Sequence, residues 1–311
     1  MPGAWSRLAL SCRCARDNQE IPLQQSDIQD FWSAHPCGDN LFGVPGGDGR
    51  EDYEAFFTRY DAAKYRLEPH IPECLDRLDV AGRRVLEIGL GQGSEAEQLI
   101  RRGAMWTGVD LTETAVRRTA SRLVLRKLPH EGLCQASVLD LPFPDDSFDV
   151  VFSHGVLHHV PEILRAQREI RRVLKPGGEL VVMLYARWSM NYLVSIGLVR
   201  RAALLAAYPL ARLGLLGGSR PLLSAHVSNA RRYGLMRYLH MSTFIHHNTD
   251  GPNNPFSRVY DLRRVRRDFP DFGVRRAEKR FMHAPPLPVH GLAGERALGW
   301  HLWVRLSPRA R

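Results

Sequence analysis

An apolar run that ends in three closely spaced glycines constrains this chain more than any other stretch. Residues 84–99 read RVLEIGLGQGSEAEQL, and a polar segment with good helical propensity follows Gly89, Gly91 and Gly93. The pattern predicts a buried strand, a tight glycine turn and the first turns of a helix. Turns of this kind bring backbone close to a nucleotide, so the stretch predicts a nucleotide-containing ligand.

Short apolar segments and helical segments alternate after this turn. We expect strands over residues 84–88, 106–109, 133–137, 148–152 and 179–184, and helices over residues 94–102, 113–126 and 162–174. Ser94 and Glu97 predict a capping box at the start of the first of these helices. The alternation predicts an α/β, Rossmann-like fold with a mostly parallel sheet and helices on both faces.

Acidic residues stand at successive strand ends. Glu87 precedes the glycines, Asp110 ends the second strand, and Asp140 follows the third. A carboxylate at the end of the second strand can accept from both ribose hydroxyls, and Asp140 is placed to accept from an adenine amino group. The NAD fingerprint G-x-G-x-x-G would need glycine where the chain has Ser94, so the pattern favours another adenosine ligand.

Residues 83–185 resemble the class I S-adenosylmethionine-dependent methyltransferases, most of all the branch of ubiquinone/menaquinone C-methyltransferases and small-molecule methyltransferases. The segments VLEIGLGQG, GVDLT, LDLPFPDDSFDVVFSHGVLHHV and LKPGGELVV carry the resemblance in this order. It implies a seven-stranded sheet with an antiparallel last strand, to which the late segments 272–284 and 297–307 would contribute the final hairpin. It also implies methyl transfer with S-adenosyl-L-methionine as cofactor.

The resemblance further implies which residues bind this cofactor. It places Glu87 and the glycine turn near the amino-acid end of the cofactor. Asp110 and Leu111, after the second strand, would bind the ribose, and Asp140 and Leu141, after the third, the adenine. Ser153, after the fourth strand, would lie beneath the sulfonium. The predicted cofactor-binding residues are Glu87, Gly89, Gly91, Gly93, Asp110, Leu111, Asp140, Leu141 and Ser153.

Three histidines just past the fourth strand are candidates for proton transfer. His154, His158 and His159 lie at the sheet edge where ligands bind in such folds, and a histidine there can act as a base near neutral pH. We take His158, with His154, as the predicted catalytic residue. The alternative is that one of these histidines packs in the core or caps the following helix.

The chain divides into three parts. Residues 71–187 and 265–311 form the predicted methyltransferase core, and residues 188–264 an insertion that covers the substrate. Residues 1–70 are partly loose; Tyr53, Phe57 and Tyr60 share one helical face that either packs on the sheet or closes over the cofactor as a lid. Tyr53 and Tyr60 are accordingly candidate substrate contacts.

A polar stretch late in the insertion is the other candidate substrate region. Residues 246–261 are rich in turn formers and in groups that bind or transfer protons. Arg258 could clamp a carboxylate or phosphate with two parallel hydrogen bonds, or could form a structural ion pair with Asp261. The candidate substrate residues here are His246, His247, Asp250, Arg258 and Tyr260.

The charge favours an acidic partner without deciding its class. The formal net charge is +10, and 39 of the 43 basic residues are arginines spread along the chain. Methyltransferases of exocyclic base amines carry an Asn/Asp-Pro-Pro-aromatic motif after the fourth strand, where this chain has SHGV. We therefore expect a small-molecule acceptor, anionic if the charge is a guide, rather than nucleic acid.

Two further features bear on location. The five cysteines form no C-x-x-C pair, so we expect no metal site and a reduced, cytoplasmic setting. The apolar residues 190–216 contain Arg200, Arg201 and Arg212, a composition that suits either lid helices over the active site or a segment lying on an anionic bilayer. We favour the lid, and keep membrane-surface action on a lipid and cofactor binding without catalysis as alternatives.

Overall fold

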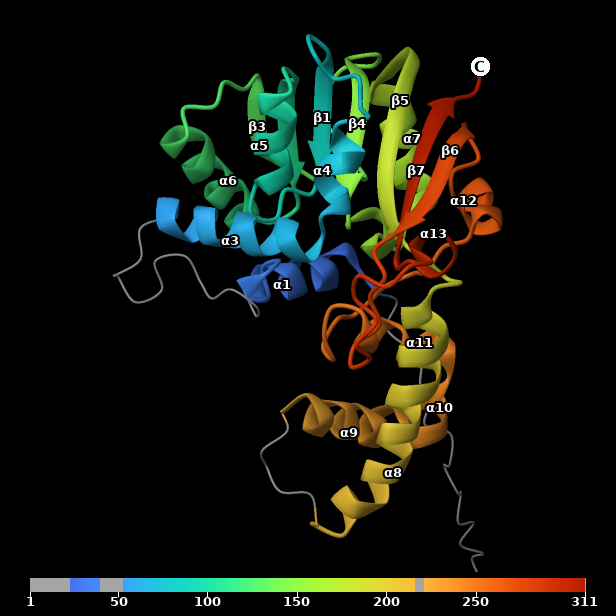
Figure 1. Ribbon diagram of the computed structural model, residues 1–311. Helices are drawn as coiled ribbons and strands as arrows, with labels where there is room; N and C mark the ends of the chain where they lie inside the picture. Colours follow the sequence, from blue (N-terminus) through green and yellow to red (C-terminus); the bar gives the residue numbers. More distant parts are fainter. Residues whose placement is uncertain (1–22, 40–52, 216–220, 311) are drawn as a thin grey trace, which may run out of the picture.

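A seven-stranded sheet forms the centre of the protein (Figure 1). The computed structural model describes residues 23–39, 53–215 and 221–310. The strand order is β3-β2-β1-β4-β5-β7-β6; the first five strands run parallel, and β7 is antiparallel to both of its neighbours. The strands are β1 (Arg84–Ile88), β2 (Met105–Asp110), β3 (Gly132–Gln135), β4 (Phe148–His154), β5 (Leu174–Tyr185), β6 (Phe272–Arg280) and β7 (His301–Pro308). The predicted sheet and its antiparallel final strand are confirmed.

Helices bury both faces of this sheet, as the mixed apolar patterns of its strands require. One face packs on α7 (Ile163–Val173) and α12 (Leu262–Asp268), and the other on α4 (His70–Leu75), α5 (Ser94–Arg101) and α6 (Glu113–Leu125). Within β1, Leu86 and Ile88 face the first layer and Val85 the second. This alternation along one strand fixes the register, because a slip by one residue would exchange the two sets.

The turn after β1 differs from the prediction in one detail. Gly93, in the left-handed conformation with φ 75°, is the residue before α5, and no side chain caps the helix. Ser94 therefore lies inside the helix and donates its hydroxyl to Asp61, while Glu97 accepts from Arg101, Arg122 and Arg126. The predicted capping box is wrong because the glycine takes the position that Ser94 would need.

Two N-terminal helices lie across the lower, carboxyl-end edge of the sheet in Figure 1. They are α1 (Gln25–Ala34) and α3 (Tyr53–Leu67). Phe56, Phe57 and Tyr60 of α3 are buried, and fully buried Arg122 lies 4.3 Å from the Phe57 ring and 2.6 Å from Asp61. A buried arginine needs such partners, so this pair fixes α3 to the core.

The insertion forms a helical projection away from the sheet (Figure 1). It contains η2 (Asn191–Arg200), α8 (Arg201–Arg212), α9 (Pro221–Tyr233), α10 (Leu235–Leu239), α11 (Met241–Phe244) and η3 (His246–Asn248). A short helix outside the insertion, α13 (Glu295–Leu298), precedes β7 and contacts β6. We call residues 191–215 and 221–239 the helical arm. Its own apolar cluster joins Leu204, Val227 and Tyr238 to Phe281 and Trp300 of the core. Within the described residues, one helix, Asn191–Arg212, has the length and composition to cross a bilayer, with 22% of its apolar window buried.

Candidate active site

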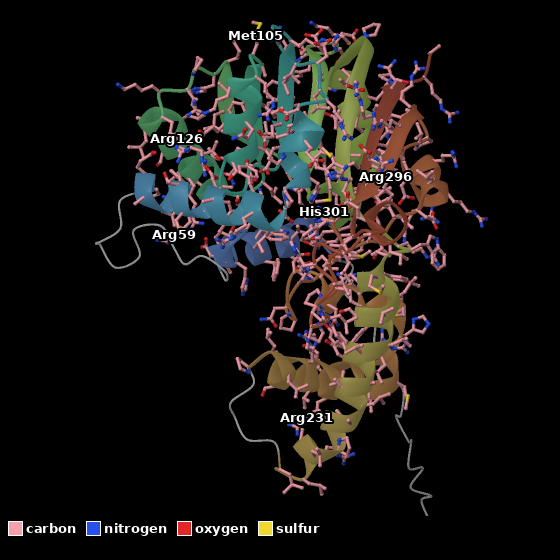
Figure 2. The ribbon with its side chains drawn as sticks, viewed as in Figure 1. Arg59, Met105, Arg126, Arg231, Arg296 and His301 are labelled. Carbon is pink, nitrogen blue, oxygen red and sulfur yellow. The ribbon has the colours of Figure 1, made fainter. Side chains whose placement is uncertain are left out.

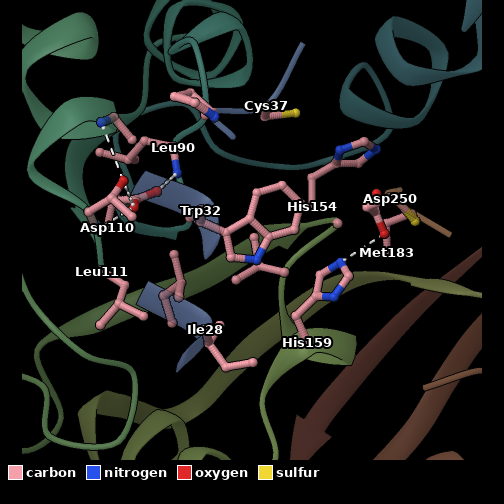
Figure 3. A pocket seen from close by; sticks show the side chains of 18 of the residues that line it. Ile28, Trp32, Cys37, Leu90, Asp110, Leu111, His154, His159, Met183 and Asp250 are labelled. Atoms are coloured by element: carbon pink, nitrogen blue, oxygen red, sulfur yellow. Dashed lines mark hydrogen bonds and ion pairs between the residues drawn. The ribbon is translucent and has the colours of Figure 1, made fainter. Parts of the chain in front are cut away.

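A cavity of about 620 Å³ opens at the carboxyl-end edge of the sheet. The turn after β1 and the ends of β2, β4 and β5 form its floor, α1 and α3 supply one wall, and residues 249–251 and 281–301 contribute to another. Figure 3 shows Asp110 and Leu111 on one side of this space and His154, His159 and Asp250 on the other. The cavity thus has two ends, built from different parts of the chain.

The glycine turn brings backbone to the first end. Gly89 has φ 83°, and a Cβ there would overlap with the Val156 side chain, so only glycine fits. Asp110 Oδ2 accepts from the Leu90 amide at 2.7 Å, and Oδ1 accepts from the amide and hydroxyl of Thr112, each at 2.8 Å. Burial raises the pKa of Asp110 against these hydrogen bonds. Because a carboxylate has about four lone-pair sites, Asp110 keeps acceptor capacity toward the cavity.

The next part of this end comes from the turn after β3. Ser137, Val138 and Leu139 line the cavity, with the Ser137 hydroxyl donating to Gln25 of α1 at 2.7 Å. The structure places Asp140 outside the cavity and exposed to solvent, and the amide of buried Leu141 donates to Glu169. β3 ends two residues before the predicted boundary and the chain turns back at Ser137, which directs Asp140 outward.

An N-terminal wall closes over the glycine turn. Ile28 and Trp32 of α1, Cys37 beyond it and Tyr60 of α3 all line the cavity. The Gln92 side chain donates to the Cys37 carbonyl at 2.8 Å, and Arg118 holds Asp39 with two hydrogen bonds of 2.6 and 2.9 Å. These contacts hold residues 37–39 against the turn. Tyr53 lies at the exposed start of α3 and does not line the cavity.

His154, the last residue of β4, begins the second end of the cavity. Its Nε2 is buried and has no hydrogen-bond partner among the described residues. Burial lowers the pKa of His154 to about 4, so the ring is neutral near pH 7. A neutral, unpartnered imidazole nitrogen can accept a hydrogen bond from a ligand or donate one to it, according to its tautomer.

Three side chains form a connected group beside it. The Tyr185 hydroxyl donates to Asp250 Oδ1 at 2.8 Å, and His159 Nε2 lies 3.3 Å from Asp250 Oδ2. His159 Nδ1 lies 2.8 Å from the Phe256 carbonyl, which can only accept, so Nδ1 carries a proton. Burial opposes ionisation of Asp250, but His159, Tyr185 and Thr249 together hold its pKa below the usual range. The group therefore fixes a carboxylate in the cavity wall.

Glu68 contributes a second carboxyl group to this end. It follows α3, lines the cavity and lies 3.7 Å from His301 Nε2; the other ring nitrogen of His301 contacts His70 Nε2 at 3.0 Å. Burial raises the pKa of Glu68 to about 7, against an opposing effect of Lys64. Lys64 is itself paired with Glu95 at 2.6 Å. Sequence reasoning missed Glu68 and His301, since their pairing joins residues more than 230 positions apart and has no local signal.

Residues 86–182 match the model of the methyltransferase domain family. This match lies on the strands and turns that build the cofactor end of the cavity. The core is a class I S-adenosylmethionine-dependent methyltransferase domain. The cofactor end suits an adenosine that carries an amino acid and no phosphate. It offers the glycine turn, Asp110 and the apolar side chains of Leu111 and Val138.

Named relatives share part of this methyltransferase domain. The 27-O-demethylrifamycin SV methyltransferase of Amycolatopsis mediterranei (strain S699) is 36% identical over 104 residues, which are 33% of this chain and 38% of the relative. The ubiquinone biosynthesis O-methyltransferase of Alkalilimnicola ehrlichii is 34% identical over 139 residues, 44% of this chain and 54% of the relative. The matched segments thus span about two fifths to one half of these relatives.

A solved structure extends the likeness of fold beyond the matched segment. The geranyl diphosphate C-methyltransferase from Streptomyces coelicolor A3(2) aligns with 92% of this chain and 97% of its own, with 15% identity and a TM-score of 0.52. At this identity the likeness concerns the fold alone. It supports the arrangement of the methyltransferase core with its N-terminal and inserted helices.

His158 has a different position from the one predicted. It is fully buried, its ring centroid lies 3.8 Å from that of Tyr185, and it does not line the cavity. Residues Leu157–His159 form one 3-10 turn, in which successive side chains point in different directions, so His159 faces the cavity and His158 faces the core. The placement leaves His154 as the predicted catalytic histidine that reaches the site.

Three predicted cofactor residues support the floor without lining it. Glu87 accepts from the Trp106 indole at 2.7 Å, and Ser153 donates to the Ile88 carbonyl at 3.0 Å. A Cβ at Gly93 would lie 3.1 Å from Thr119 and 3.3 Å from Arg122, so this glycine faces α6. The predicted residues that do line the cavity at this end are Gly89, Gly91, Asp110 and Leu111.

Of the late polar stretch, Asp250 reaches the cavity, with its neighbours Thr249 and Gly251. The Arg258 guanidinium donates to the Val160 and Pro161 carbonyls at 2.9 and 2.7 Å, so neither the predicted clamp nor an ion pair with Asp261 is present. The other predicted residues lie outside the cavity: His246, which stacks on Phe256, His247, which packs at the base of the arm, and Tyr260, which is fully buried. Within the described part of the chain, no group of three or more potential ligands could hold a metal ion.

Proposed function

We propose that this protein transfers the methyl group of S-adenosylmethionine to a hydroxyl oxygen of an uncharged small-molecule or lipid acceptor. The observation that carries the proposal is one continuous cavity, which joins the cofactor end at Gly89 and Asp110 to the polar end at His154, Glu68 and Asp250. Two ligands that react by direct displacement need one continuous, water-excluding space of this kind.

The charges in the second end favour an uncharged acceptor over the anionic one expected from the composition. Lys64 is paired with Glu95, and Arg258 is turned onto backbone carbonyls. The other titratable groups described as lining the cavity are carboxyl groups, histidines, tyrosines and a cysteine, none of which is a permanent cation that would hold an anion. The arginine-rich composition therefore concerns the protein surface more than this cavity.

The residues of the chain have distinct tasks in such a reaction. When bound, S-adenosylmethionine supplies an electrophilic methyl group on a sulfonium, so the protein has to position the acceptor and remove its proton. Glu68, with a pKa of about 7, is suited to take the hydroxyl proton near neutral pH, and His154 to hold the oxygen by a hydrogen bond. The names of two relatives, an O-methyltransferase and a methyltransferase of 27-O-demethylrifamycin SV, support oxygen as the acceptor atom.

Calorimetry and label transfer test the proposal. S-adenosylhomocysteine should bind and NADH should not; binding of NADH alone would contradict the cofactor assignment. With [methyl-³H]S-adenosylmethionine, label should pass to 27-O-demethylrifamycin SV or to hydroxylated quinols. Glu68→Gln should lower kcat and remove the rise of kcat near pH 7 while cofactor affinity stays unchanged. Equal transfer to the O-methylated forms of these acceptors would rule out the hydroxyl as the reacting group.

A further inference from the structure

The helical arm carries an apolar surface that the rest of the described chain does not cover. Eight of the seventeen large apolar side chains exposed among the described residues lie between positions 193 and 236. Leu198, Ala202, Leu205, Pro209 and Leu213 follow one another at helical spacing and are all exposed. We call these five residues the outer face of the arm.

The outer face is not the packing side of its helix. Leu204 and Ala207, on the other side of α8, are buried with Val227 and Ala230 of α9. α8 and α9 thus bury each other's apolar sides, and the outer face is exposed apolar surface in addition to this interface. Leu215 and Leu222 are also about two-thirds exposed. Contiguous exposed apolar surface of this kind marks an interaction site.

The charge of the arm indicates an anionic partner. Residues 180–249 contain no aspartate or glutamate and eight arginines. Arg212, Arg231 and Arg232 are exposed on the arm, and Figure 2 shows Arg231 far from the sheet. A protein surface partner would be expected to meet mixed charges, whereas apolar side chains accompanied only by arginines match the acyl region and the anionic headgroups of a phospholipid bilayer.

The long helix of the arm is poorly suited to crossing a bilayer. Arg200 and Arg201 stand in the middle of Asn191–Arg212, the helix that is long enough to span among the described residues, where a charge is costly. Arg200 donates to the Asn248 and Pro285 carbonyls, and the Ser195 hydroxyl also donates to Pro285. These contacts fix the helix to the core up to Arg200, and the outer face extends beyond this anchored part.

We propose that the helical arm docks the protein peripherally on an anionic phospholipid bilayer, with the outer face in the headgroup–acyl boundary and the arginines at the phosphates. The apolar cluster of the arm continues to Phe281, which lines the cavity, so the docked arm would face the acceptor end toward the bilayer. The docking itself does not depend on the proposed reaction.

Vesicle flotation with the full chain tests this proposal directly. The protein should float with phosphatidylcholine vesicles that contain 30% phosphatidylglycerol, and binding should fall at least tenfold with phosphatidylcholine alone. Arg231→Gln/Arg232→Gln should weaken binding severalfold at low salt and less at high salt, because screening already removes part of the attraction. Leu205→Glu/Leu213→Glu should abolish flotation.

The matched control is Leu164→Glu on α7 of the core, a leucine that is 49% exposed and far in sequence from the arm. It should float like the unmodified protein. Unchanged melting temperature and S-adenosylhomocysteine affinity in all variants would show that folding and cofactor binding are intact. Flotation of the Leu205→Glu/Leu213→Glu variant at the unmodified level would overturn the proposal. So would failure of the unmodified protein to float while these leucines instead hold two copies together in light scattering.

Discussion

Tyr185, the last residue of β5, donates its hydroxyl to Asp250 at 2.8 Å, and the two side chains join the sheet to the base of the inserted segment. His158 packs on the Tyr185 ring from the core side, and His159 contacts Asp250 from the cavity side. The adjacent histidines after β4 therefore have separate tasks: one supports the tyrosine and the other holds the carboxylate.

Alanine variants of Asp110 and Asp140 form a matched pair that tests the cofactor-binding role of each residue. Asp110 lines the cavity and is fixed by three hydrogen bonds, whereas Asp140 is exposed outside it. Asp110→Ala should weaken S-adenosylhomocysteine binding by at least tenfold, the loss expected for a charged hydrogen-bond acceptor. Asp140→Ala should leave the affinity within about twofold. Calorimetry checks both, and a larger loss in the Asp140 variant would restore the adenine role expected from the sequence.

Alanine substitutions at Gly89 and Gly82 distinguish the cost of steric overlap from the cost of backbone strain. Both have positive φ, 83° and 70°, but a Cβ at Gly82 meets nothing within 4 Å, whereas one at Gly89 overlaps with Val156. Gly82→Ala should cost about 1–2 kcal/mol of unfolding free energy. Gly89→Ala should lower the unfolding free energy by more than this and abolish cofactor binding. Adding Val156→Ala to Gly89→Ala should recover part of the lost stability. Denaturant titrations of the four proteins measure this; equal costs at the two glycines would contradict the packing argument.

The sequence predicted those parts of the site that depend on local pattern. Gly89 and Asp110 stand at strand ends with a clear apolar periodicity, and both line the cavity. Asp140 was misplaced because the end of β3 was set two residues too late, and a shift of this size moves a side chain from cavity to solvent. Glu68 and His301 had no local signal, because their position depends on how α3 and β7 meet at the sheet edge.

Glu68 should make stability depend on pH. Burial raises its pKa from 4.5 to about 7, so the folded protein binds this proton more tightly than the unfolded chain. The folded state then loses stability as the pH rises from 4.5 through 7, and the loss is complete above 7. Glu68→Gln, which cannot ionise, should therefore stabilise the protein at pH 8 by about 2–3 kcal/mol and have a much smaller effect at pH 4.5. Urea unfolding at both pH values measures the difference, and a larger effect at the lower pH would contradict it.

Arg258 should affect folding more than cofactor binding. Its two hydrogen bonds to the Val160 and Pro161 carbonyls fix the segment between β4 and α7. Arg258→Lys keeps the charge but cannot make both bonds in the same geometry, so we expect a loss of about 1–2 kcal/mol of unfolding free energy. Thermal denaturation measures the loss, with S-adenosylhomocysteine affinity as the control. A stable variant with impaired acceptor turnover would return Arg258 to the substrate role.

The position of β7 inside the sheet affects how the chain can fold during its synthesis. β7 follows β6 in sequence but pairs with β5 on one side and β6 on the other, so the edge of β5 stays unpaired until residues His301–Pro308 have been made. At about 5–20 residues per second, the 116 positions between Tyr185 and His301 take roughly 6–23 s. The leucine-rich arm emerges in the same interval. A nascent chain thus exposes an unpaired strand edge and an uncovered apolar helix at the same time. Both features favour misassembly and chaperone binding.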